Sequence, residues 1–151
     1  MNKKTKCSLL LMMITFLFVG IGCQMKTNKQ EIPFTVAEKY FVKNTVKSID
    51  EPKITTQEAF NQIFGMATVM GPNGRPTPID FGKQYVIAVM KPTTDYKTTL
   101  TPVSLQKDSK GDIIFSYKVE KGEKQTYSFT PALLIIVDNN YTGPIVLKEI
   151  M

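Results

Sequence analysis

The chain has 151 residues, of which 42% are hydrophobic and 21% are charged, a composition typical of a single globular domain. It contains no histidine and only two cysteines, which excludes imidazole catalysis, four-cysteine zinc sites and mixed cysteine–histidine zinc sites. The formal net charge is +6, from 19 basic and 13 acidic residues.

The first residues have the pattern of a secretory signal. A basic start precedes an almost wholly apolar run over residues 9–21, which is shorter than the roughly 20 residues that cross a bilayer. Residues 19–23, Val-Gly-Ile-Gly-Cys, follow and resemble the lipobox of bacterial lipoproteins, in which the signal is cut before an acylated cysteine. The resemblance implies a signal peptide over residues 1–22 and a palmitate-type lipid on Cys23.

Cleavage and acylation at this position predict a protein that is anchored to a membrane without spanning it. Residues 1–22 hold three lysines and no acid, so removal of the signal peptide lowers the net charge from +6 to +3. With this smaller positive charge, we do not expect the protein to bind nucleic acid. The polar residues 23–33 predict a flexible tether. Gln24 follows the cysteine where an aspartate would resemble an inner-membrane retention signal, which favours the outer membrane over the inner one.

We expect one domain over residues 34–151. Residues 34–44 alternate apolar and polar side chains, which favours a strand, although residues 36–39 also fit the start of a helix. Thr55 and Glu58 have the spacing of a capping box, and apolar residues follow at helical spacing. The spacing predicts a helix over about 56–67, with one apolar stripe packed on a sheet, formed by Phe60, Ile63, Phe64 and Ala67.

The second half of the domain reads as β structure. Residues 85–90 and 132–137 are continuous apolar runs, which predict central strands covered on both faces. Residues 113–119 and 126–129 alternate and predict half-buried strands joined by a turn at residues 121–123. The remaining expectations are an edge strand around Pro102 and a last strand over residues 145–149. The fold class is therefore α+β, a mainly antiparallel, sandwich-like sheet with one packed helix.

Residues 138–144 and Glu149 approach the spacing of a calcium-binding EF-hand loop. Asp138, Asn140 and Glu149 would supply oxygen ligands, and a glycine would make the sharp turn. Only two residues follow Glu149 in the sequence, so we expect no helix that would orient this ligand. The favoured interpretation is a hairpin turn between two strands, with no metal and no cofactor.

Two further segments are candidates for binding a partner. Residues 71–78 contain three prolines and two glycines, and their loop presents Asn73 and Arg75, the only arginine of the chain. An arginine on a restricted loop loses little entropy on binding a carboxylate, although the loop also fits a simple connection. Tyr96 lies between polar groups and is a second candidate contact.

The sequence lacks the patterns of a catalytic site. No serine lies in a Gly-x-Ser-x-Gly motif, and no histidine is present to activate one. Four aspartates fall near the ends of predicted strands and leave a carboxylate pair as an alternative: Asp80, Asp95, Asp112 and Asp138. We therefore expect no enzymatic activity, with a carboxylate-based hydrolase as the competing hypothesis.

Residues 79–89, the alternating strand pair and Thr130-Pro131 resemble the PrcB-like domain of bacterial envelope lipoproteins. The resemblance covers about residues 80–149 and implies a small β-rich module, named from a subunit that assists a cell-surface protease. Residues 93–95, Thr-Thr-Asp, stand where that family usually has Thr-Gly-Gly, so no functional residue is carried over. More broadly, the chain looks like the small envelope lipoproteins of Bacteroides-type bacteria.

Taken together, the residues predict a lipid-anchored envelope protein that binds a protein partner as an accessory or inhibitory module without catalysis. The alternatives are a small-ligand or calcium binder and a carboxylate-based hydrolase.

Overall fold

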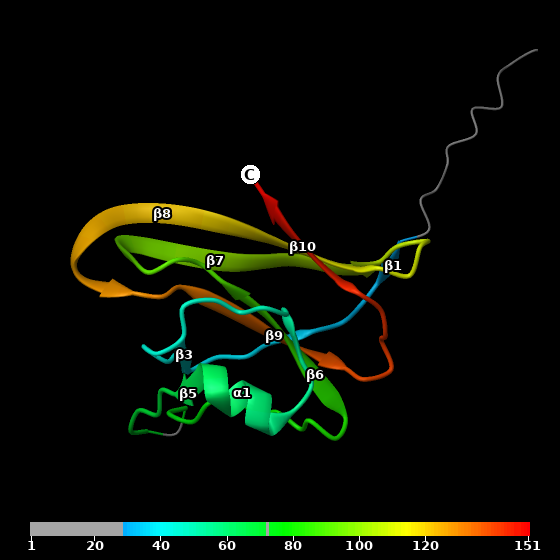
Figure 1. Ribbon diagram of the computed structural model, residues 1–151, viewed down its shortest axis with the longest axis horizontal. Helices are drawn as coiled ribbons and strands as arrows, with labels where there is room; N and C mark the ends of the chain where they lie inside the picture. Colours follow the sequence, from blue (N-terminus) through cyan, green and yellow to red (C-terminus); the bar gives the residue numbers. More distant parts are fainter. Residues whose placement is uncertain (1–28, 72) are drawn as a thin grey trace, which may run out of the picture.

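The computed structural model describes residues 29–71 and 73–151 (Figure 1). The predicted signal peptide and lipid site at Cys23 lie outside these residues. The described chain is mostly antiparallel β structure with one short helix, α1, over Gln57–Ile63. Its strands are β1 Gln30–Glu31, β2 Thr35–Val36, β3 Tyr40–Val42, β4 Lys53–Ile54, β5 Phe64–Met66, β6 Gln84–Met90, β7 Thr94–Lys107, β8 Ile113–Phe129, β9 Ala132–Asp138 and β10 Ile145–Ile150.

The strands form two four-stranded sheets and a separate pair. Sheet A has the order β1-β7-β8-β10, sheet B has the order β2-β9-β6-β4, and β3 pairs with β5. Every pairing is antiparallel except that of β10, which runs parallel to β8. The hairpin predicted over residues 138–144 is therefore wrong, because this loop carries the chain from β9 in sheet B to β10 in sheet A.

The two sheets are joined by a continuous two-stranded ribbon. In sheet B, β6 pairs with β9 along its whole length. The same two stretches of chain continue into sheet A, where β7 pairs with β8. The Lys91 N–H donates to the Pro131 carbonyl (2.9 Å), and the Thr93 and Thr130 hydroxyls lie 2.9 Å apart, so the ribbon stays paired as it turns. Figure 1 shows this turn as the strong curl of β8 at one end of the molecule.

One side between the sheets is closed by the chain itself. The segment from β1 to β2 passes from sheet A to sheet B, and the Ile32 N–H donates to the Leu105 carbonyl (2.8 Å). Ile32 is 3% exposed and belongs to the core. The tether predicted over residues 23–33 therefore extends too far, because β1 and Ile32 are part of the domain.

The opposite side is open. β4 has only two residues, because its neighbour Pro52 has no N–H to continue the ladder with β6. The last contact is the Ala88 N–H, which donates to the Pro52 carbonyl (2.8 Å). Within residues 29–71 and 73–151, no strand lies between β4 and β10 to join the two sheets on this side.

Two hydrophobic clusters cover the two faces of sheet B. Alternate residues of β6 and β9, such as Tyr85 and Ile135, pack with sheet A residues that include Phe115. The residues between them, such as Val86 and Ile136, pack with α1 and β5. The prediction that residues 85–90 and 132–137 form central strands is thus confirmed, and alternation of side chains along each strand explains it.

The helix is shorter than predicted. It ends at Ile63, and residues 64–66 form β5 against β3 instead of continuing the helix to residue 67. Phe60 and Phe64 are both buried at 2% exposure, but Phe64 reaches the core from a strand. The N-cap is Thr56 and not Thr55, because the Thr56 hydroxyl accepts the Ala59 N–H at 3.2 Å.

The cap assignment gives a stability prediction. Thr56→Ala is expected to lower the free energy of unfolding by about 1 kcal/mol, because the Ala59 N–H loses its acceptor. The matched control is Thr55→Ala, which removes the same atoms from an exposed neighbour and is expected to leave stability unchanged. Urea unfolding followed by circular dichroism measures both, and equal losses would contradict the assignment.

The turn predicted at residues 121–123 is also wrong. β8 continues through these residues, and Lys121 pairs with Thr98 of β7. Gly122 lies at an irregularity of the ladder, where the register between β7 and β8 shifts between the Tyr96–Lys124 and Thr98–Lys121 pairs. The turn between β7 and β8 precedes β8, where Gly111 has a φ of 93°. The edge position of Pro102 is confirmed, since β1 pairs only with the far end of β7.

Candidate functional site

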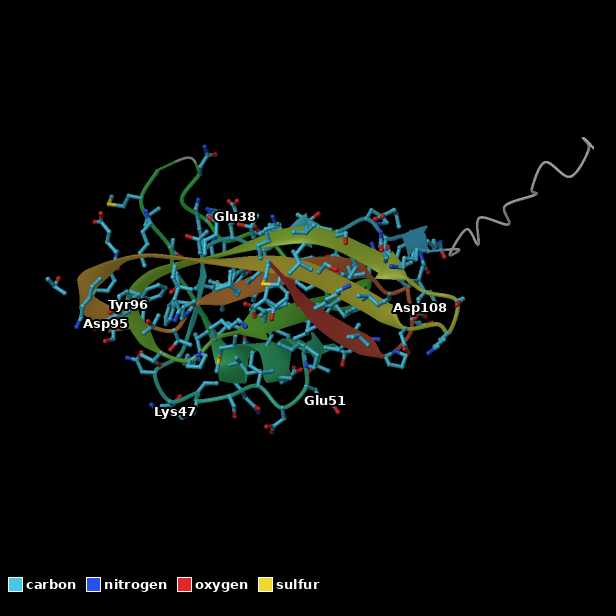
Figure 2. The ribbon with its side chains drawn as sticks, turned by 90° about the horizontal axis from the view of Figure 1, so that it is seen from above. Glu38, Lys47, Glu51, Asp95, Tyr96 and Asp108 are labelled. Carbon is cyan, nitrogen blue, oxygen red and sulfur yellow. The ribbon has the colours of Figure 1, made fainter. Side chains whose placement is uncertain are left out.

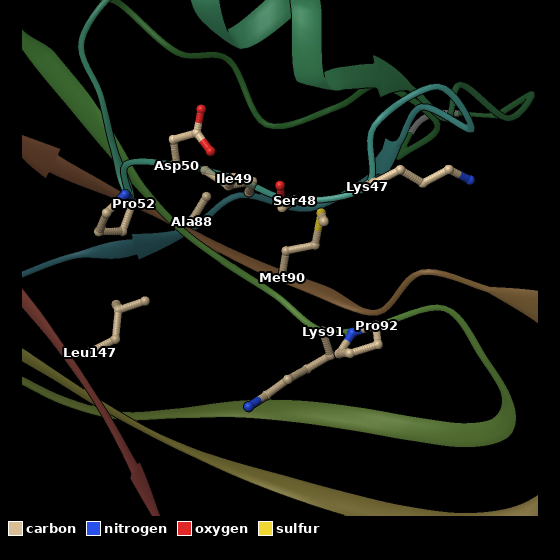
Figure 3. A pocket seen from close by; sticks show the side chains of 10 residues that line it. All are labelled: Lys47, Ser48, Ile49, Asp50, Pro52, Ala88, Met90, Lys91, Pro92 and Leu147. Carbon is tan, nitrogen blue, oxygen red and sulfur yellow. The ribbon is translucent and has the colours of Figure 1, made fainter.

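The open side between the sheets contains a groove that follows β10. Three adjoining hollows of about 270, 430 and 320 Å³ line up beside Ile145, Leu147 and Glu149 respectively. The first two share Pro52, and the last two share Lys91. We call this feature the β10 groove and define it by six residues: Pro52, Met90, Lys91, Ile145, Leu147 and Glu149. Figure 3 shows its middle part, with Leu147 across from Ala88 and Met90.

The exposed edge of β10 carries main-chain groups without a neighbouring strand. The Ile113 N–H donates to the Pro144 carbonyl (2.8 Å), which fixes the phase of the parallel ladder. In that phase, alternate residues of β10 bond to β8, and the N–H and C=O groups of Ile145, Leu147 and Glu149 point away from it. Since β10 is the last strand of sheet A, these groups face the groove side.

An ion pair crosses the groove near its end. The Lys91 Nζ lies 2.5 Å from the Glu149 carboxylate and 5.3 Å from the centre of the Tyr117 ring. Lys91 stands where β6 leaves sheet B, and Glu149 lies on β10 of sheet A. The pair therefore links the two sheets across their open side. It also neutralises the negative charge of Glu149, whose side chain extends from the edge strand β10 into the groove.

The surroundings keep Lys91 protonated. Burial is the largest influence and lowers the pKa of the Lys91 amine, whereas hydrogen bonds and charges from Glu149 and Tyr117 raise it. The net result is a pKa above the ordinary lysine value. The protonated Lys91 amine therefore matches the charge of the Glu149 carboxylate beside it.

The three predicted partner-binding residues do not gather at one place. Asn73 and Arg75 are exposed in the loop before β6, and that loop is held to the chain near β3, where the Glu38 N–H donates to the Thr77 hydroxyl (3.0 Å). Figure 2 shows Tyr96 at the curved end of β7 and Glu38 on another flank. No ion pair among the described residues includes Arg75.

The structure separates Glu149 from the other two candidate calcium ligands, Asp138 and Asn140. The Asp138 carboxylate accepts the Asn140 N–H at 2.8 Å within the turn after β9. Glu149 lies five residues beyond the turn on β10 and binds Lys91. Gly143, the sharp-turn glycine of that pattern, has a φ of 155°, and a Cβ there would come within 2.2 Å of the Gly111 carbonyl oxygen. Its conformation thus fits close packing against the turn before β8.

Three of the four aspartates proposed for a hydrolase have carboxylates engaged in local contacts, and the fourth, Asp112, lies in the turn before β8. The Asp80 carboxylate accepts the Gly82 N–H at 3.0 Å, and Asp95 lies 3.2 Å from Lys124. With Asp138 in its own turn, these three carboxylates occupy three different loops or edges. Within the part of the chain that the structure describes, no group of three or more histidine, cysteine or acidic residues is placed to hold a metal ion.

Sequence reasoning missed the β10 groove. It placed the last strand over residues 145–149 correctly but did not assign Leu147 or Lys91 a role. One signal was available, because residues 145–150, Ile-Val-Leu-Lys-Glu-Ile, combine apolar residues with two charges, as exposed edge strands do. The partner strand and the open side could not be read from that pattern.

Comparisons with protein-family models, curated proteins and solved structures find no match to this chain. The resemblance to the PrcB-like domain therefore stays a prediction. No helix within residues 29–71 and 73–151 is long and apolar enough to cross a membrane.

Proposed function

We propose that the chain is an envelope protein, held at the bacterial outer membrane by lipid on Cys23, that binds another envelope protein without catalysing a reaction. In this proposal the domain is an α+β sandwich with one open side, and the β10 groove at that side is the binding surface. An accessory or inhibitory role toward a larger partner, such as a protease complex, follows from this kind of module.

The observation that carries the proposal is the combination of apolar lining and unused main-chain groups in one groove. Leu147 lines the groove and is 37% exposed, on an edge strand whose outer main-chain groups have no neighbouring strand. Apolar residues exposed beside an unpaired edge are a common feature of interaction surfaces, because soluble proteins otherwise protect such edges.

The state of the charged groups supports a role without catalysis. Lys91 is held protonated by Glu149, and three of the aspartates considered above make separate local contacts. The groove accordingly offers shape, apolar surface and hydrogen-bond partners, which are the requirements of binding.

Leu147→Asp tests the proposal by placing an unpaired carboxylate in the groove. Tagged full-length protein, crosslinked in cells and purified from detergent-solubilised envelopes, is expected to recover a partner that this variant loses. Val146→Asp is the matched control, because it adds the same charge at the neighbouring position on the other face of β10 and is expected to retain the partner. Recovery of no partner above background by the unmodified protein would contradict the proposal, as would equal recovery by both variants.

A further inference from the structure

We propose that the β10 groove binds an extended peptide segment of the partner, which adds to sheet A as a fifth strand and carries a carboxylate at the end nearest Lys121. This inference rests on the proposed function, and it specifies how the groove recognises its partner. Its argument uses the main chain of β10, the groove lining and the charges at one end of the groove.

The main chain of β10 selects an extended strand. The N–H and C=O groups of Ile145, Leu147 and Glu149 point away from β8 at a regular spacing of two residues. An added strand satisfies these donors and acceptors in one row, whereas a helix or a small ligand does not. The open side leaves room for such a strand, because β4 stops at Pro52 and does not reach β10.

The side-chain lining suits alternating apolar residues. Every second side chain of the added strand would point into the groove, where Pro52, Met90 and Leu147 form apolar walls around its middle hollow of about 430 Å³. Glu149 also faces inward, but its charge is balanced by Lys91 at 2.5 Å. An edge strand with an unbalanced inward charge would repel a neighbour, so this ion pair makes the edge usable.

The charge at one end of the groove favours a carboxylate. The hollow beside Glu149 is also lined by Lys121 and by the hydroxyl-bearing residues Thr93, Thr94 and Thr98. The ion pairs of the described residues are Lys83–Asp80, Lys91–Glu149 and Lys124–Asp95, so Lys121 is in none of them. The Thr98 hydroxyl donates to the Tyr96 carbonyl and the Thr93 hydroxyl is bonded to that of Thr130, whereas the Thr94 hydroxyl only accepts, from the Tyr96 N–H. The Lys121 amine and the Thr94 hydroxyl can therefore donate to an acidic side chain or a peptide carboxyl terminus.

The test uses a peptide as the probe. A phage-displayed library of random seven-residue peptides is selected on the full chain in detergent, and a selected peptide is synthesised for calorimetry and amide hydrogen exchange. We expect sequences with alternating apolar residues and an acidic residue at one end. Binding is expected to slow exchange at the Leu147 and Glu149 amides, and size-exclusion chromatography is expected to show one copy of the protein per complex.

Backbone methylation distinguishes strand addition from other modes of binding. Methylating the peptide amides that face β10 is expected to weaken binding at least about tenfold, because each methyl group removes a main-chain hydrogen bond and leaves an acceptor of β10 unpaired. Methylating the intervening amides is expected to change affinity by less than about twofold. Equal effects of the two methylation patterns would overturn the inference.

The carboxylate preference has its own matched variants. Lys121→Glu is expected to weaken the selected acidic peptide about fivefold, whereas Lys118→Glu, on the other face of β8, is expected to leave it within about twofold. A library without binders, peptides that bind without protecting Leu147 and Glu149, or pairing of two protein copies through β10 would each overturn the inference. If envelope capture still depends on Leu147 in that case, the proposed function stands and only the mode of recognition fails.

Discussion

The Phe115→Ala variant is expected to lose about 3–5 kcal/mol of unfolding free energy, a large share of the stability of a domain of this size. Phe115 is 0% exposed and lies in the cluster that joins the two sheets. Its ring centre is 6.1 Å from that of Phe34 and 6.0 Å from that of Tyr117. Phe115 is flanked by Leu105 of β7 on one side and by Leu147 of β10 on the other, so the cavity left by alanine cannot close easily.

Urea unfolding followed by circular dichroism measures this loss, since the chain contains no tryptophan for fluorescence. The control is Ile114→Ala, at the adjacent position of β8 and outside both core clusters. We expect this control to lose no more than about 1 kcal/mol. A loss at Phe115 no larger than that at Ile114 would show that the packing between the sheets is not what stabilises the domain.

The strands buried on both faces were predictable because their sequence leaves few choices. Residues 85–90 and 132–137 are apolar at every position or nearly so, and short apolar runs rich in branched residues favour strands covered on both sides. The structure pairs them directly, with Val86 opposite Ile136. Local pattern and tertiary packing agree here, so the prediction needed no knowledge of distant contacts.

The errors occur where distant pairing overrides a local signal. Gly122 suggested a turn, but Lys121 and Lys124 on either side of it pair with β7 and keep it inside a 17-residue strand. The apolar spacing of Phe60 and Phe64 suggested one helix, but pairing of β5 with β3 ends the helix between them. Both outcomes depend on segments more than 20 residues away, which a local window does not contain.

The candidate site was harder to predict for a related reason. Its ion pair joins Lys91 to Glu149, which lie 58 residues apart in the sequence. The groove exists because Pro52 stops β4 and because β10 joins β8 in parallel, so that no strand covers the gap between them. The residues of β10 indicate neither the parallel pairing nor the open side. The loop at Arg75 has a prominent sequence pattern, but Arg75 does not line the β10 groove.

The Cys23→Ala variant is expected to remain an uncut precursor that takes up no fatty-acid label. In the lipobox interpretation, acylation of the cysteine sulfur precedes cleavage, so loss of the sulfur blocks both steps. Cys7→Ala is the matched control, because it removes the other cysteine from within the predicted signal peptide and is expected to be labelled and cut normally. Metabolic labelling with an alkyne fatty acid and electrophoretic size in a bacterial host measure the two steps together.

Membrane fractionation alone would not test this prediction, because an uncut signal can itself hold the chain at a membrane. Fatty-acid labelling and the change in size distinguish a lipid-anchored, cleaved chain from a chain held at the membrane by its uncut signal. Each buried CH₂ of an acyl chain contributes about 0.8 kcal/mol, and stable anchoring requires more than one chain. Normal labelling of Cys23→Ala would contradict the prediction, because the fatty acid would then be attached at a residue other than Cys23. The domain itself is expected to fold in either case, because its first strand begins at Gln30, beyond the cysteine.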